Sequence, residues 1–232
     1  MSQIKYIFLD CMETIIDLHE LPSSSDYAYW TYFNSGVEDY WENFNEFLIN
    51  YEEAKNSISA NLAYNEEYDI IQRIDYVVKH NGRIGLEFKH RVSERLFNTY
   101  WNTYKSKCFV HQDVKAALVN LSRKYKLVVI SNFKVRNGIE ELLEINKIKH
   151  LFDLIITSIN FGWRKPDHRI YEYAINLSKC RTNEIVFMGD DYQNDYVVPR
   201  QIGIKSFLLN KGQTYINTDM VANYLEFEEK LT

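Results

Sequence analysis

The sequence has little glycine and little proline, with 8 Gly and 3 Pro among 232 residues. So few glycines leave few places for a glycine-rich loop around a phosphate, and neither GxGxxG nor GxxxxGK[ST] occurs. This lack argues against a nucleotide-binding protein of the glycine-loop kind. An anion site in this chain has to be sought among side chains instead.

Cysteine and long apolar runs are also scarce. The three cysteines, Cys11, Cys108 and Cys180, are far apart and form no CxxC pair, which fits reduced thiols better than a secreted disulfide scaffold. The first apolar run, Tyr6–Leu9, stops at Asp10, and no run approaches the 18 or so residues of a membrane helix. We therefore expect a soluble cytoplasmic protein with no membrane partner.

Positive charge does not dominate either. The chain has 27 Lys and Arg against 32 Asp and Glu, a formal charge of −5, and no basic run of five or more. Nucleic acid is therefore not an expected partner. With 46% hydrophobic and 25% charged residues, the composition is that of a globular protein. The length fits one domain with an insertion or two small domains, as a monomer or a homodimer.

Five short apolar runs predict buried strands, one near the start of the chain and four in its second half. Four segments of helical character lie between these runs. Strands that alternate with helices indicate a doubly wound, Rossmann-like α/β fold on a parallel sheet. The predicted strands are Lys5–Leu9, Leu127–Ile130, Leu154–Ile156, Ile185–Met188 and Ile204–Leu208, and the predicted helices are Val114–Tyr125, Val135–Ile148, Arg169–Lys179 and Asp195–Gln201.

The stretch between the first and second strands has no comparable apolar run. Residues with helical spacing instead form three stripes, from Val37 to Leu48, from Ile70 to Val78, and from Phe88 to Tyr104. The sequence therefore predicts an all-helical insert. We expect a core domain of residues 1–17 and 108–232 and a helical cap domain of residues 18–107.

Polar side chains follow the predicted strands at the points where they end. The first strand is followed by Asp10, the second by Ser131 and Asn132, and the fourth by Gly189, Asp190 and Asp191, while Lys165 lies just beyond the third. The carboxyl ends of parallel strands meet at one edge of a sheet, where ligands bind. Carboxylates, a hydroxyl, an amide and an ammonium at one edge form a coherent set for nucleophilic chemistry on an anion.

In this order the four segments resemble the motifs of the haloacid dehalogenase-like hydrolase superfamily. Those motifs are a strand ending in DxDx[TV], a strand ending in Ser or Thr, a distant Lys, and an acidic GDxxxxD. The helical insert also resembles a cap domain of that family. The corresponding residues are Asp10 to Thr14 (DCMET), Ser131, Lys165, and Asp190 with Asp195.

The resemblance implies roles for the matching residues. Asp10 is expected to be the nucleophile and to form an aspartyl ester. Thr14 and Ser131, with Asn132 beside them, are expected to hydrogen-bond the nucleophile or the substrate, and Lys165 is expected to neutralise charge. The implied substrate is a small anionic molecule.

The resemblance also implies a Mg²⁺ site, for which oxygen ligands are suited. Asp190 is expected to bind the ion together with Asp10 and the backbone carbonyl of Met12, and Asp191 and Asp195 are expected to support it. Asp191 has an alternative interpretation as the N-cap of the next helix.

Met12 departs from the family pattern, because the phosphatases have a second Asp there that protonates the leaving group. General acid–base catalysis contributes about 10²–10⁴ in rate, so its loss predicts weak hydrolysis of unactivated esters. Dehalogenases of the family have no acid at this position, and Asn132 and Tyr171 resemble that branch, with Tyr171 as a candidate substrate-binding residue. Against that branch, Asp190 is acidic and no Arg precedes Arg73.

The leading hypothesis is a Mg²⁺-dependent hydrolase that acts on a small phosphorylated or otherwise activated anion. Two alternatives remain open. One is a catalytically weakened binding or regulatory protein with this fold, and the other is a hydrolase like the 2-haloacid dehalogenases.

Overall fold

The computed structural model describes residues 3–213 and 215–231. The chain divides into two compact units. The first, here the core unit, comprises Met1–Asp17, Asn65–Glu67 and Phe109–Thr232, and the second, here the helical unit, comprises Leu18–Tyr64 and Tyr68–Cys108. Three residues from within the inserted segment therefore belong to the core unit.

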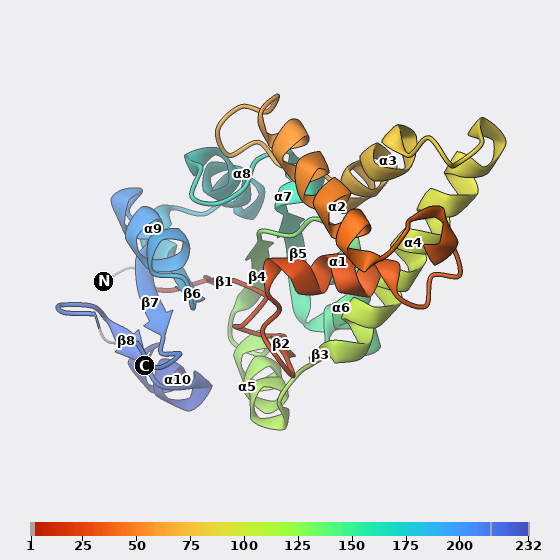
Figure 1. The fold of residues 1–232 in the computed structure, drawn as a ribbon. Coiled ribbons are helices and arrows are strands. Elements are labelled where there is room, and N and C mark those ends of the chain that lie inside the picture. Colours follow the sequence, from red (N-terminus) through yellow and green to blue (C-terminus); the bar gives the residue numbers. More distant parts are fainter. Residues whose placement is uncertain (1–2, 214, 232) are drawn as a thin grey trace. The chain divides into compact units, whose positions relative to one another are not determined.

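A six-stranded sheet forms the centre of the core unit (Figure 1). Its strand order is β5-β4-β1-β6-β7-β8, and every neighbouring pair is parallel. Such sheets have helices on both faces, so their central strands are buried throughout, as β6 is at all five residues. The strands are β1 (Tyr6–Leu9), β4 (Lys126–Ser131), β5 (Phe152–Thr157), β6 (Ile185–Gly189), β7 (Lys205–Leu209) and β8 (Met220–Val221).

The sequence predicts five of these strands to within a few residues. It does not predict β8, nor β2 (Asp17–Leu18) and β3 (Cys108–Phe109), which pair in a separate two-stranded sheet. Each of these three strands has two residues, too few for an alternation pattern to be recognised.

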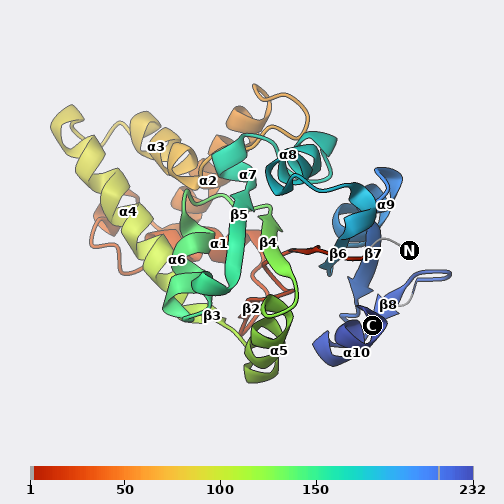
Figure 2. The ribbon, with the colours of Figure 1, turned by 180° about the vertical axis from the view of Figure 1, so that it is seen from behind.

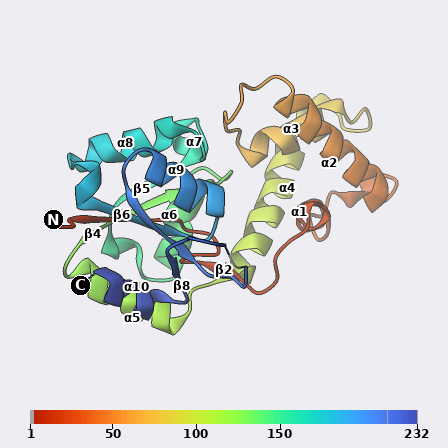
Figure 3. The ribbon, with the colours of Figure 1, turned by 90° about the vertical axis from the view of Figure 1, so that its left-hand side faces the viewer.

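Helices cover both faces of the six-stranded sheet (Figure 3). On one face, Ile170 and Ala174 of α8 pack in a core cluster with Phe8 of β1, Val128 of β4 and Phe187 of β6. On the other face, α5 and α10 pack together. This is the doubly wound α/β fold that the sequence predicts. The helices are α5 (Gln112–Ser122), α6 (Gly138–Ile145), α7 (Ser158–Phe161), α8 (His168–Ser178), α9 (Val198–Gln201) and α10 (Tyr224–Leu231), with short turns η2 (Lys149–Leu151), η3 (Thr182–Glu184) and the π-helical η4 (Tyr192–Val197).

The helical unit contains α1 (Ser24–Tyr32), η1 (Glu38–Tyr40), α2 (Phe44–Ser59), α3 (Ile70–His80) and α4 (Leu86–Lys107) (Figure 2). The helices predicted around the second and third stripes are present as α3 and α4. The prediction of one helical stripe from Val37 to Leu48 is wrong. Asn43 is the N-cap of α2, its side chain accepts a hydrogen bond from the backbone of Glu46, and the helix therefore begins at Phe44.

Aromatic rings fill the interior of the helical unit. Trp30, Trp41 and Trp101 are all buried. The ring of Phe47 lies 5.1 Å from that of Tyr32 and 5.0 Å from that of Trp41. These rings are therefore core side chains of this unit. Within residues 3–213 and 215–231, every helix is too short or too polar to cross a membrane.

Candidate active site

The candidate site lies where the strand order of the sheet changes direction. From β1 the chain adds β4 and β5 on one side, and it then returns to add β6, β7 and β8 on the other. Such a switch point opens a crevice beyond the carboxyl ends of the strands. Asp10 directly follows β1, and Asp190 directly follows β6, so the topology places both carboxylates at this crevice.

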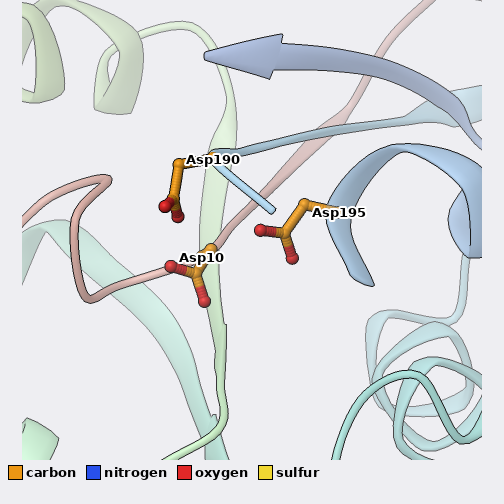
Figure 4. Close-up of side chains that lie close together, drawn as sticks. All are labelled: Asp10, Asp190 and Asp195. Atoms are coloured by element: carbon orange, nitrogen blue, oxygen red, sulfur yellow. The ribbon is translucent and has the colours of Figure 1, made fainter. Parts of the chain in front are cut away.

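Three carboxylates meet at this point (Figure 4). Asp10, Asp190 and Asp195 each offer an oxygen, and these oxygens lie within 4.8 Å of one another. Asp195 comes from the π-helical turn η4 and is completely buried. Asp190 and Asp195, five positions apart in the sequence, therefore both lie beside Asp10 at the end of β1.

Gly189 makes room for the carboxylate of Asp195. A Cβ atom built on Gly189 would lie 2.3 Å from Oδ2 of Asp195, which is closer than real Cβ contacts come. The same oxygen accepts a hydrogen bond of 3.0 Å from the backbone N–H of Asp191. The requirement for glycine at the end of β6 thus has a specific cause.

Lys165 neutralises part of this charge. Its Nζ donates to Oδ1 of Asp10 at 2.7 Å and to Oδ1 of Asp195 at 2.6 Å. Burial lowers the pKa of Lys165, but the charges of Asp10 and Asp195 outweigh burial, so its pKa lies above its ordinary value. The side chain is therefore a buried ammonium ion at neutral pH.

One ammonium does not balance three carboxylates. If all four groups are ionised, the cluster has two surplus negative charges. Burial, followed by the charge of Asp10, raises the pKa of Asp190, although the Thr14 hydroxyl donates to it at 3.2 Å. Burial likewise raises the pKa of Asp195, against the opposing effect of Lys165. This donor set of carboxylate oxygens fits a divalent cation such as Mg²⁺.

The end of β4 supplies two more of the expected residues. Ser131 lies two positions beyond Val129, the β4 partner of Leu9, and is therefore beside the start of the Asp10 turn. Among the described residues, the buried Ser131 hydroxyl has no hydrogen-bond partner, so it is available to an anion. Asn132 instead binds the backbone of Lys165, donating from Nδ2 to its carbonyl at 2.9 Å and accepting its N–H at 2.7 Å.

Two expected residues have their side chains engaged elsewhere. Asp191 is exposed, lies outside the three-carboxylate group, and accepts from the backbone N–H of Asn194 at 2.7 Å, as its N-cap alternative predicts. Tyr171 is completely buried, and its hydroxyl donates to the Asn194 carbonyl at 2.5 Å. The Tyr171 hydroxyl thus holds the turn that leads to Asp195, and its substrate-binding role stays a prediction.

Met12 lies in a tight turn. The backbone N–H of Ile15 and that of Ile16 both donate to the Cys11 carbonyl, at 2.8 and 2.9 Å, and Glu13 has a left-handed φ of 61°. The turn brings Thr14 back to Asp190. Glu67, a buried carboxylate that borders the Lys165 loop, cannot be recognised from the sequence, because one acidic residue in a polar segment has no distinguishing pattern.

A model of the family described as haloacid dehalogenase-like hydrolase matches residues 44–209. This match covers well over half of the chain. The chain belongs to the haloacid dehalogenase-like hydrolases. It is thus a member of a hydrolase family with the parallel-sheet core described above.

Two curated relatives share this likeness over part of their length. The chain is 40% identical over 87 residues to haloacid dehalogenase-like hydrolase domain-containing protein 3 of Bos taurus, covering 38% of this chain and 34% of that protein. The match thus spans about a third of that relative's length. The chain is also 30% identical over 139 residues to glyceraldehyde 3-phosphate phosphatase of Methanothermobacter thermautotrophicus, a match that covers 60% of this chain and 56% of that protein.

Among solved structures, a 2-haloacid dehalogenase from Pseudomonas syringae pv. Tomato DC3000 is similar with a TM-score of 0.74. The likeness covers 99% of this chain and 98% of that chain at 15% sequence identity. At that identity the comparison concerns the fold of this haloacid dehalogenase-like hydrolase, not its substrate.

Proposed function

We propose that this chain is a Mg²⁺-dependent hydrolase that forms an aspartyl ester at Asp10 with a small phosphorylated or otherwise activated anion. The observation that carries the proposal is the grouping of Asp10, Asp190 and Asp195 at the switch point of the sheet, with the buried Lys165 bound to Asp10 and Asp195. The phosphatase named among the relatives, at 30% identity, supports a phosphorylated substrate.

The surplus negative charge of the site is the argument for a cation. With all three carboxylates ionised, their two surplus negative charges would repel an anionic substrate, and their burial strengthens that repulsion. Asp10 and Asp190, together with the Met12 carbonyl, would hold Mg²⁺, and Asp195 would support them. When bound, the ion would supply Lewis-acid stabilisation of negative charge on the substrate.

The protein side chains have distinct tasks in this proposal. An oxygen of Asp10 attacks the phosphorus, the bond from phosphorus to the leaving oxygen breaks, and water later hydrolyses the ester at Asp10. Lys165 stabilises the negative charge that gathers near Asp10. The Ser131 hydroxyl donates to a substrate oxygen, which would satisfy its buried polar group.

Met12 favours substrates whose leaving group needs no proton. A thioether cannot donate a proton, so a leaving group that departs as a stable anion is better suited than an alkoxide. This is the feature that favours the second candidate, hydrolysis of a carbon–halogen bond with release of halide. The likeness in fold to a 2-haloacid dehalogenase is compatible with it.

Turnover assays separate these candidates. The wild-type chain is expected to hydrolyse an activated aryl phosphate with Mg²⁺, and Asp10→Asn is expected to abolish this turnover. Release of chloride from a 2-chloroacid without metal, combined with no aryl phosphate turnover, would favour the dehalogenase candidate. If neither substrate is turned over, the binding or regulatory alternative gains support.

Calorimetric titration tests the metal site directly. Mg²⁺ is expected to bind the wild-type chain and to bind Asp190→Asn much more weakly. Asp191→Asn is the matched control, because its carboxylate is exposed and lies outside the three-carboxylate group. Equal affinities of the wild type and Asp190→Asn would contradict the proposed site.

A further inference from the structure

A short segment from within the insert pairs with the backbone just before Lys165. The segment Asn65–Glu67 belongs to the core unit, although the residues on both sides of it belong to the helical unit. The Glu67 N–H donates to the Gly162 carbonyl at 2.9 Å, and the Arg164 N–H donates to the Asn65 carbonyl at 2.9 Å. These bonds flank an isolated antiparallel bridge between Glu66 and Trp163, and the second segment of this bridge continues directly to Lys165.

The side chain of Glu67 continues from this bridge into the protein interior. Only 1% of it is exposed. Its Oε2 accepts a hydrogen bond of 2.8 Å from the hydroxyl of Ser158, the first residue of α7. The Ser158 hydroxyl in turn accepts the backbone N–H of Phe133 at 2.9 Å. Through Ser158, the carboxylate is thus connected to the loop that follows Ser131 and Asn132.

Two cations lie near the same carboxylate. Lys134 Nζ is 3.6 Å from Oε1 of Glu67, and Arg164 Nε is 4.0 Å from Oε2. Both cations are about one-third or more exposed, so they keep contact with solvent while their charge offsets that of the buried carboxylate. Lys134 belongs to the loop after β4 and Arg164 to the loop before Lys165, so Glu67 contacts both.

These two loops hold candidate site residues that must be in register. Lys165 must reach Asp10, and the Ser131 hydroxyl must face the substrate. Asn132 already joins the loops through its two hydrogen bonds to the Lys165 backbone. Glu67 contacts the same pair of loops through Ser158, Lys134 and Arg164.

We propose that Glu67 is a positioning residue, which fixes the Lys165 loop against the loop after Ser131. The effect on catalysis rests on the proposed function, whereas the effect on the loops does not. Misplacement of reacting groups by about 1 Å can cost up to about 10²-fold in rate. Loss of the Glu67 carboxylate is therefore expected to lower kcat and to leave KM nearly unchanged.

Three variants separate the contributions of this side chain. Glu67→Ala removes both the hydrogen bond from Ser158 and the charge between Lys134 and Arg164, whereas Glu67→Gln keeps an acceptor for Ser158. Glu66→Gln is the matched control, since it removes an equal charge from the neighbouring position of the same bridge. Each variant is compared with the wild type as the full chain.

Amide hydrogen exchange reports on the loops whether or not the enzyme turns over a given substrate. Faster exchange is expected in peptides spanning residues 132–136 and 162–166 of Glu67→Ala, with the rest of the core unit unchanged and Glu66→Gln like the wild type. Unchanged exchange in these peptides would overturn the proposal. So would equally faster exchange throughout the core unit, because that would be general destabilisation.

Steady-state kinetics on an aryl phosphate test the catalytic consequence. We expect kcat to fall about tenfold in Glu67→Ala, and less in Glu67→Gln, with similar KM values. Unchanged kcat in a variant with faster loop exchange would overturn the positioning role. If the wild type itself is inactive, the proposed function has failed, and the exchange experiment still decides whether Glu67 holds the loops.

Discussion

Lys165 and Asp10 are 155 residues apart in the sequence, yet Nζ of Lys165 donates to Oδ1 of Asp10 at 2.7 Å inside the core unit. The same ammonium binds Asp195 at 2.6 Å, and only 2% of the lysine side chain is exposed. A buried charge that loses its partner is costly, because water cannot replace the lost interaction. The ion pairs of Lys165 with Asp10 and Asp195 are therefore expected to matter for the free energy of unfolding as well as for the site.

Replacing Lys165 tests this expectation. Lys165→Met leaves Asp10 and Asp195 buried without their cation, and we expect it to lower the free energy of unfolding by about 3–5 kcal/mol. Urea denaturation at pH 7 measures the change. Lys211→Met is the control, because Lys211 pairs with Asp17 at 2.9 Å with 40% of its side chain exposed, and such pairs contribute about 0–1 kcal/mol. Similar losses in both variants would contradict the burial argument.

Met12 offers a test of the missing acid. In Met12→Asp a carboxyl group occupies the position that protonates the leaving group in the family's phosphatases. We expect kcat/KM for an alkyl phosphate to rise by about 10²–10⁴, and that for an aryl phosphate to rise less, since an aryl oxide leaves without a proton. Met12→Asn is the control, with similar size and no transferable proton. An equal rise in Met12→Asn would remove acid catalysis as the cause.

The convergence of Asp10, Lys165 and Asp190 could be anticipated because each residue follows a predicted strand of a parallel sheet. Strand ends fix position along the sheet, and the doubly wound topology places them at one edge. The hydrogen bonds made by each side chain could not be anticipated in the same way. Tyr171 has the right sequence position, but its hydroxyl donates to the carbonyl of Asn194. For Asp191, the N-cap alternative does predict the hydrogen bond that its Oδ1 accepts from the N–H of Asn194.

The start of α2 and the contacts of Glu67 are two further features that the sequence does not predict. Val37 and Trp41 have the spacing of an apolar helix face, but the Asn43 cap determines where the helix begins. Apolar periodicity does not detect this start of the helix, because Val37 and Trp41 are buried in the core although they lie outside α2. Glu67 lies in the inserted segment, and its contacts with Ser158 and Arg164 depend on tertiary structure alone.

Gly189 is expected to tolerate no side chain. Alanine there would place its Cβ against Oδ2 of Asp195, so Asp195 would have to leave its position beside Lys165. We expect Gly189→Ala to weaken Mg²⁺ binding and to lower the melting temperature. Gly82→Ala is the control, because no atom lies within 4 Å of a Cβ built at Gly82. Unchanged Mg²⁺ affinity in Gly189→Ala would contradict the role of Asp195 in supporting the metal.

Glu184 connects the starts of β1 and β6, far from the candidate site along both strands. Its Oε1 lies 2.6 Å from Lys5 Nζ, and its Oε2 accepts the Arg181 N–H at 3.0 Å. The hydrogen bond from Lys5, followed by that from the Arg181 backbone, lowers the pKa of Glu184 from 4.5 to about 2. The ionised carboxylate is thus favoured in the folded state relative to the unfolded chain.

The sign of this shift sets a pH window for the stability that Glu184 contributes. The contribution is complete above the unfolded pKa of 4.5 and is lost as the pH falls toward the folded value of about 2. We therefore expect Glu184→Gln to be less stable than the wild type in urea denaturation at pH 7, with a difference that shrinks as the pH falls below 4.5. Glu172→Gln, at an exposed position on α8, is the control. A difference that stays constant with pH would show that ionisation of Glu184 is not the source of its effect.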